Sequence, residues 1–115
     1  MKKLIGKQGE VKIYLIDELP KDMQSRPMEK ITGGTIISHS ESGNHHILTG
    51  GDVIERTDNV PAGMRILYGI LDKPASLIQD ATVPHGKFDF ESGYLEFRCA
   101  RSYNHFAQEA RRVAD

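Results

Sequence analysis

Histidine is the residue type in this chain whose spacing could support metal chemistry. A polar, turn-forming segment precedes His45, and a two-residue turn at Ser42-Gly43 would place His39 directly opposite His46. Directly opposed residues share a face of a hairpin, with Cβ atoms about 5 Å apart. His45 would point to the other face, because neighbours on a strand alternate. With His85 as a third ligand, His39 and His46 would suit zinc, iron or copper.

This histidine site depends on the assumed turn, because a shift of one residue in register separates His39 from His46. The main alternative is structural: the histidines are polar residues at a hairpin edge, or partly buried imidazoles that hydrogen-bond the backbone. A third alternative is a protonation switch. The expectation is therefore a protein without a cofactor, and the metal site remains the competing hypothesis.

Other catalytic arrangements are not indicated by the sequence. Cys99 lies in phase with Leu95 and Phe97, which predicts a small buried hydrophobic residue rather than a nucleophile beside a histidine. The glycine pairs at 33–34 and 50–51 do not precede helices, as phosphate-binding loops would require. A single cysteine also excludes an internal disulfide. We therefore expect that the protein is not an enzyme.

The elements that would position these residues are short. Glycines and prolines divide the chain into segments of about five to nine residues, a spacing typical of all-β domains. We predict a single domain, residues 1–115, mainly β: a small antiparallel β-barrel or β-sandwich of about eight short strands with a short C-terminal helix. The predicted strands cover residues 10–17, 30–38, 45–49, 52–56, 65–71, 76–79, 88–91 and 94–101.

Individual segments of this arrangement carry further predictions. Residues 30–38 and 45–49 are predicted to pair as a hairpin, with a bulge or bend at 33–34. Residues 65–71 are apolar on both faces, which predicts a central strand. Residues 21–29 are polar, contain Pro27 and are predicted to form a loop.

The end of the chain changes to a helical period. Phe106, Ala110 and Val113 form one helical stripe after the potential N-cap Asn104, which predicts a docking helix over 104–115. Arginines gather at this end, so a surface for a protein partner is one interpretation; simple solvation, or pairing of the arginines with Glu96 and Glu109, is the other. The candidate partner-binding residues are Arg98, Arg101, Tyr103, Phe106, Arg111 and Arg112.

The charge balance limits the class of partner. Fifteen Lys and Arg against sixteen Asp and Glu give a net charge of −1, which argues against a strongly basic nucleic-acid binder. No apolar run reaches the length of a membrane span, and the charged start lacks the apolar stretch of a secretory signal. We expect protein partners, no direct nucleic-acid binding, no membrane and a cytoplasmic location.

Motifs at both ends and in the middle of the chain resemble a family of small uncharacterised β-rich proteins of bacteria and their phages. The similar features are the opening Gln-Gly-Glu-Val at 8–11, a following Leu-Pro at 19–20, the hairpin 40–46, His85, Gly93, Arg-Ser-Tyr at 101–103 and Arg-Val-Ala-Asp at 112–115. The chain departs from the family pattern because its two hairpin histidines are adjacent. It also has Thr82 at a position where the family often has histidine, and Leu95 where the family has tyrosine.

The resemblance implies a phage-associated β-rich protein with no activity to carry over. We expect a non-enzymatic virion component, such as a capsid decoration (cement) protein or a head or tail accessory protein, made in the host cytoplasm. It would bind capsid or other virion proteins and form a homo-oligomer, because symmetric self-association is common. The alternatives are a metal-binding β-barrel enzyme that uses the histidine cluster, and a phage-encoded regulatory or inhibitory protein that binds a host factor.

Overall fold

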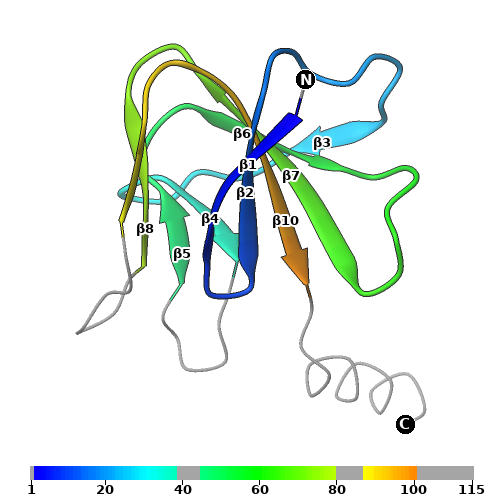
Figure 1. Ribbon diagram of the computed structural model, residues 1–115, viewed down its shortest axis with the longest axis horizontal. Helices are drawn as coiled ribbons and strands as arrows, with labels where there is room; N and C mark the ends of the chain where they lie inside the picture. The colour runs from blue at the N-terminus through cyan, green and yellow to red at the C-terminus, as the bar shows by residue number, and fades with distance from the viewer. Residues whose placement is uncertain (1, 39–44, 80–86, 101–115) are drawn as a thin grey trace, which may run out of the picture.

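The computed structural model describes residues 2–38, 45–79 and 87–100, which form ten antiparallel strands in two sheets (Figure 1). The six-stranded sheet contains, in spatial order, β1 (Lys2–Gln8), β2 (Val11–Ile16), β10 (Gly93–Ala100), β7 (Met64–Leu71), β6 (Asp52–Arg56) and β3 (Ser25–Pro27). The four-stranded sheet contains β4 (Thr35–Ser38), β5 (His46–Leu48), β8 (Ala75–Gln79) and β9 (Phe88–Phe90). These residues contain no helix.

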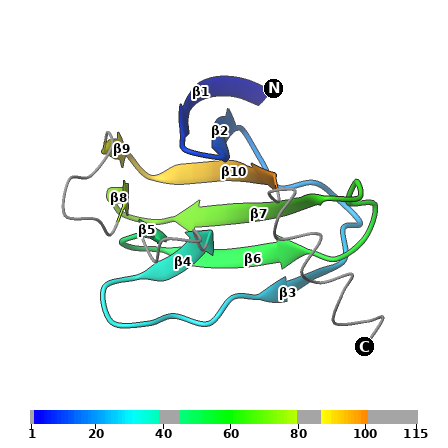
Figure 2. The same ribbon diagram turned by 90° about the horizontal axis from the view of Figure 1, so that it is seen from below.

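The two sheets pack face to face as a sandwich, with β10 and β7 central in the larger one (Figure 2). Phe97 of β10 lies directly between Ile13 of β2 and Leu67 of β7, and all three side chains are fully buried. Alternate residues of a strand point to one face, so this row faces the other sheet. Further core side chains come from both sheets: Val11, Ile37, Leu48, Val53, Leu71, Leu77, Phe90, Leu95 and Cys99.

A long connection joins β2 to β3 in the six-stranded sheet. These strands are separated in the sheet by β10, β7 and β6, and residues 17–24 link them (Figure 1). The Thr57 N–H anchors the far end of the connection by donating to the Gln24 carbonyl at 2.9 Å. Tyr68 lies opposite Glu96 and Ile54, on the other face from Leu67, and is 1% exposed.

The mainly-β prediction is confirmed, and the sandwich rather than the barrel is the form observed, since the described strands form two separate sheets. The hairpin of β4 with β5 and the central position of β7 are also as predicted. The strand predicted over 30–38 is shorter, because only Thr35–Ser38 forms β4. The predicted helix 104–115 lies outside the described residues.

Two strands were missed. β1 carries three lysines and only two large apolar residues, and its pairing with β2 holds it in the sheet despite this weak pattern. β3 lies in the segment predicted as a loop, and Pro27 is tolerated there because β3 is an edge strand.

Gly34 provides a test of the close approach between the start of β4 and β5. Its φ is +140°, and a Cβ atom there would collide with the Leu48 carbonyl oxygen. Gly33 also has a positive φ, +96°, but no atom lies within 4 Å of its Cβ position. We predict that Gly34→Ala lowers the free energy of unfolding by about 3 kcal/mol or more, and Gly33→Ala by about 1–2 kcal/mol. Equal losses in urea titrations would contradict this packing.

Candidate functional site

His46 lies at the junction of the two sheets and is fully buried. Its Nδ1 is 2.7 Å from Oε1 of Gln8, and Nε2 of Gln8 donates to the Leu77 carbonyl at 3.2 Å. A carbonyl can only accept, so the Gln8 amide must turn its oxygen toward the imidazole, and Nδ1 of His46 is the donor. This chain of bonds joins the end of β1 in the larger sheet to β5 and β8 in the smaller one.

The second ring nitrogen of His46 faces Glu10, in the turn between β1 and β2. Nε2 is 3.5 Å from Oε2 of Glu10 and has no hydrogen-bond partner, although it is buried. With the proton on Nδ1, this nitrogen carries a lone pair. Gly9 closes the space above the ring, because a Cβ there would lie 3.1 Å from Nε2. The arrangement can therefore accept a proton between His46 and Glu10.

Ser38 completes this cluster without forming a nucleophilic triad. Its hydroxyl donates to Oε1 of Glu10 at 2.8 Å. In a serine hydrolase the serine hydroxyl bonds to the imidazole, which then removes its proton. Here the hydroxyl bonds to the carboxylate instead, so Ser38 is not activated by His46. Burial lowers the pKa of His46, and the neighbouring Glu10 opposes that effect only in part.

The predicted pairing of His39 with His46 is wrong by one residue. Ser38 is the strand partner of His46, because the register between β4 and β5 shifts between Ile36 and Ser38. Such an irregularity leaves no clear signal in the sequence. His39 and His85 lie outside the described residues, so the three-histidine site stays a prediction. In the part of the chain that the structure describes, no three His, Cys, Asp or Glu side chains converge as metal ligands.

The expectation for Cys99 is confirmed. The side chain is buried, its Sγ lies 3.8 Å from the Ile37 carbonyl, and burial raises the pKa of the thiol to about 12. A thiol with this pKa stays protonated near neutral pH and is a poor nucleophile.

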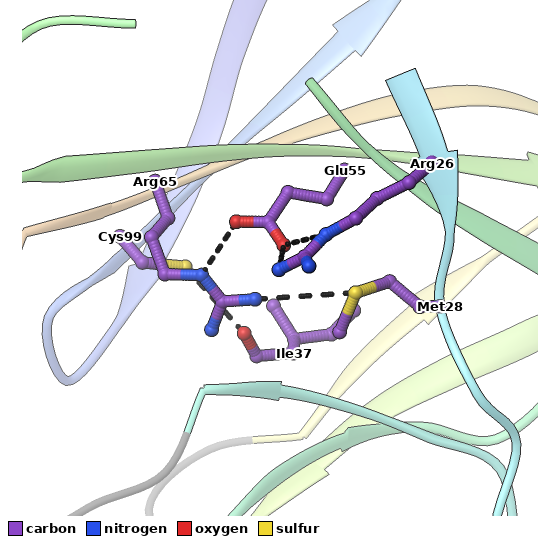
Figure 3. Close-up of polar contacts among 6 residues, drawn as sticks. All are labelled: Arg26, Met28, Ile37, Glu55, Arg65 and Cys99. Atoms are coloured by element: carbon purple, nitrogen blue, oxygen red, sulfur yellow. Dashed lines mark hydrogen bonds and ion pairs between the residues drawn. The ribbon is translucent and has the colours of Figure 1, made fainter. Parts of the chain in front are cut away.

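Glu55 of β6 lies near Cys99, held between two arginines (Figure 3). Its Oε2 accepts from Nε of Arg65 at 2.9 Å, and its Oε1 accepts from Nη2 of Arg26 at 2.7 Å. Arg65, and then Arg26, lower the pKa of Glu55, although burial opposes them. The carboxylate is thus a fixed anion held in an ion cluster, which is a structural role.

Arg98 pairs with Glu96, as one of the two sequence interpretations expects. Nε of Arg98 donates to Oε2 of Glu96 at 2.8 Å, and Nζ of Lys2 reaches the same oxygen at 3.2 Å. Both cations also lie over the Tyr14 ring, Nζ of Lys2 at 4.9 Å and Cζ of Arg98 at 5.8 Å from its centroid. The other five candidate partner-binding residues, Arg101, Tyr103, Phe106, Arg111 and Arg112, lie outside the described residues.

A surface that the sequence analysis missed lies on β1, an edge strand. Leu4 is 56% exposed and Ile5 37% exposed, and Leu15 of the adjacent strand is 46% exposed. A β-bulge separates Leu4 from Gly6. The turn residue Gly9 before the apolar alternation of β2 was the available signal, because a hairpin turn implies a preceding strand.

No helix in the described residues is long and apolar enough to cross a membrane.

The lowered pKa of His46 predicts a loss of stability in mild acid. The unfolded chain binds a proton near the ordinary pKa of 6.5, whereas the folded chain binds it only at lower pH. The free energy of unfolding should therefore fall as the pH decreases below about 6.5, until the folded pKa is reached. In urea titrations between pH 7.5 and 5, His46→Gln should reduce this dependence of the free energy of unfolding on pH. Glu10→Gln should make the dependence steeper, because Glu10 favours the protonated imidazole in the folded chain. An unchanged slope in His46→Gln would contradict the assignment.

The Glu55 cluster predicts unequal roles for its two arginines. The Arg65 side chain is 21% exposed and that of Arg26 is 66% exposed. Arg65→Met should lower the free energy of unfolding by about 3 kcal/mol, because it leaves a buried carboxylate short of its main partner. Arg26→Met should cost about 1 kcal/mol or less. Glu55→Gln in the Arg65→Met background should recover part of the loss. Equal costs in chemical denaturation would show that Arg65 is not the main partner.

Comparison with known proteins gives no relative from which a function could be transferred. No protein-family model, no curated protein and no solved structure matches the chain. The resemblance to a family of bacterial and phage proteins therefore stays a prediction, and the function has to be argued from the residues of this chain.

Proposed function

We propose that the protein is a non-enzymatic protein-binding module, and specifically an accessory component of a phage particle such as a capsid decoration or head or tail protein. The observation that carries the proposal is the exposed edge strand β1. Leu4 and Ile5 are exposed there, beside a sheet edge with which no other strand of the described residues pairs. Proteins usually blunt or cover such edges, so an edge that keeps apolar side chains exposed is suited to contact another protein.

Three of the buried ionisable groups, Glu55, Glu96 and Cys99, support a structural use of the part of the sandwich interior that they occupy. Glu55 and Glu96 are each held by two cations, and the pKa of each carboxyl is lowered. Cys99 is held as a buried thiol. A general acid or base would instead need a pKa near the working pH. The binding role therefore falls to the surface.

A decoration or accessory protein would meet its partner many times on one particle. Weak contacts at the exposed residues of β1 could then add up through multivalency, without a large interface on each copy. The protein would be made in the host cytoplasm and would end in the virion. A homo-oligomeric state would fit the symmetry of such particles.

Particle proteomics tests this proposal. We expect the protein in purified phage particles from the host that encodes it, in a fixed ratio to the major capsid or tail protein. The double variant Leu4→Asp, Ile5→Asp should remain folded and be lost from the particles. Ile31→Asp is the matched control, because Ile31 is also 46% exposed but lies away from β1 in the chain. Particles without the protein, or recovery of the protein only on a host factor, would contradict the proposal.

A further inference from the structure

We infer that the outer face and free edge of the β1–β2 hairpin bind an acidic, partly apolar extended segment of a partner protein. This inference rests on the proposed protein-binding function and adds the chemistry of the partner. It is carried by a row of three cations, two of which have no ion-pair partner in the described residues, beside exposed apolar side chains. We refer to Lys7, Lys12 and Arg98 as the cationic row.

The cationic row crosses three neighbouring strands. Lys7 of β1 lies directly opposite Lys12 of β2, and Lys12 lies directly opposite Arg98 of β10. Neighbouring strands are about 4.8 Å apart, and paired residues point to the same face. Like charges placed directly opposite each other destabilise a sheet. The chain therefore keeps a local arrangement that costs stability.

Two of these cations are not neutralised within the described structure. Arg98 is paired with Glu96, but Lys7 and Lys12 are exposed and take part in no ion pair or hydrogen bond among residues 2–38, 45–79 and 87–100. Lys3 is also exposed and unpaired in the same range. An acidic ligand would relieve the repulsion between Lys7 and Lys12, so these two lysines favour the binding of a carboxylate.

Apolar surface adjoins the cationic row. Leu4 lies opposite Tyr14, in the next outward-facing pair of the same hairpin. Leu4 is 56% exposed, and the neighbouring Ile5 is 37% exposed. A ligand that follows β1 would thus meet carboxylate-binding and aliphatic contacts in turn. β1 is seven residues long, and its outer edge, which pairs with no strand among residues 2–38, 45–79 and 87–100, offers backbone groups to an added strand.

Two other occupants fit less well. A nucleic acid would meet a chain with a net charge of −1 and few aromatic platforms, and the nearby Tyr14 ring is already contacted by Lys2. A second copy that paired symmetrically through β1 would bring its own lysines against Lys3 and Lys7. An acidic protein segment avoids both conflicts.

Fluorescence anisotropy with a labelled peptide of Glu-Thr-Val-Thr repeats, which carries glutamate and valine on one face of an extended strand, tests the inference on the full chain. The native protein should bind this peptide, and binding should weaken as salt rises. Lys7→Glu with Lys12→Glu should weaken binding about tenfold or more, because two attractions become repulsions. The matched control is Lys21→Glu with Lys73→Glu. It changes the net charge equally at exposed lysines outside the hairpin and should leave binding unchanged.

The single variant Lys7→Glu separates a binding role from a structural one. It places a carboxylate opposite Lys12, so the folded hairpin should keep or gain thermal stability. We expect the Lys7→Glu variant to bind the peptide more weakly than the native protein, although its hairpin is at least as stable.

The inference is overturned if the native protein does not bind the peptide or if the reversed variants bind it equally well. It is also overturned if a single-stranded oligonucleotide binds more tightly than the peptide through the same lysines. These outcomes are distinguishable from failure of the proposed function. Absence from phage particles would refute the virion role while peptide binding is retained, whereas presence in particles without peptide binding would refute only the acidic-partner inference.

Discussion

The structure depends on the row of Ile13, Phe97 and Leu67, which lies in register across β2, β10 and β7 and is fully buried. Phe97 meets Phe90 of the other sheet edge-to-face, with ring centroids 6.5 Å apart. Gly69 leaves room for the Phe97 ring, because a Cβ there would lie only 3.3 Å from Cε2 of Phe97. Burial of each such side chain stabilises the fold by about 1.5–3 kcal/mol. Packing along this row sets the separation of the sheets and thereby seats the β1–β2 turn over β5.

The alternation that builds this row is visible in the sequence, so the central strands, the class of fold and the inward position of Cys99 could be predicted. β1 and β3 were not predicted, because strand pairing holds them more than their own apolar patterns do; the turn at Gly9 was the one sequence signal for β1. β1 is rich in lysine, and β3 contains Pro27 at an edge. The choice of a sandwich over a barrel also lies beyond local pattern, since it depends on which strands pair across the chain.

In the site, too, contacts between residues close in the sequence were predictable, whereas contacts between distant segments were not. Arg98 and Glu96 lie two residues apart in β10, and their pairing was one of the two sequence interpretations. The surroundings of His46 were not predictable, because the shift that pairs it with Ser38 arises from an irregular strand. Gln8 and Glu10 meet His46 only through contact between the sheets. Likewise, Lys7 and Lys12 are five positions apart in the sequence, and only the hairpin shows them to be direct neighbours.

In the proposed function, β1 is the surface that contacts the partner protein. Hydrogen–deuterium exchange of the chain, free in solution and in the assembled particle, would locate the contact surface. In the free chain, amides on the outer edge of β1 should exchange quickly, because no strand in the described part of the chain pairs with that edge. In the particle, exchange within Lys2–Gln8 should slow, with little change in β7. Slowed exchange elsewhere, with β1 as fast as in the free chain, would show that the partner binds another surface.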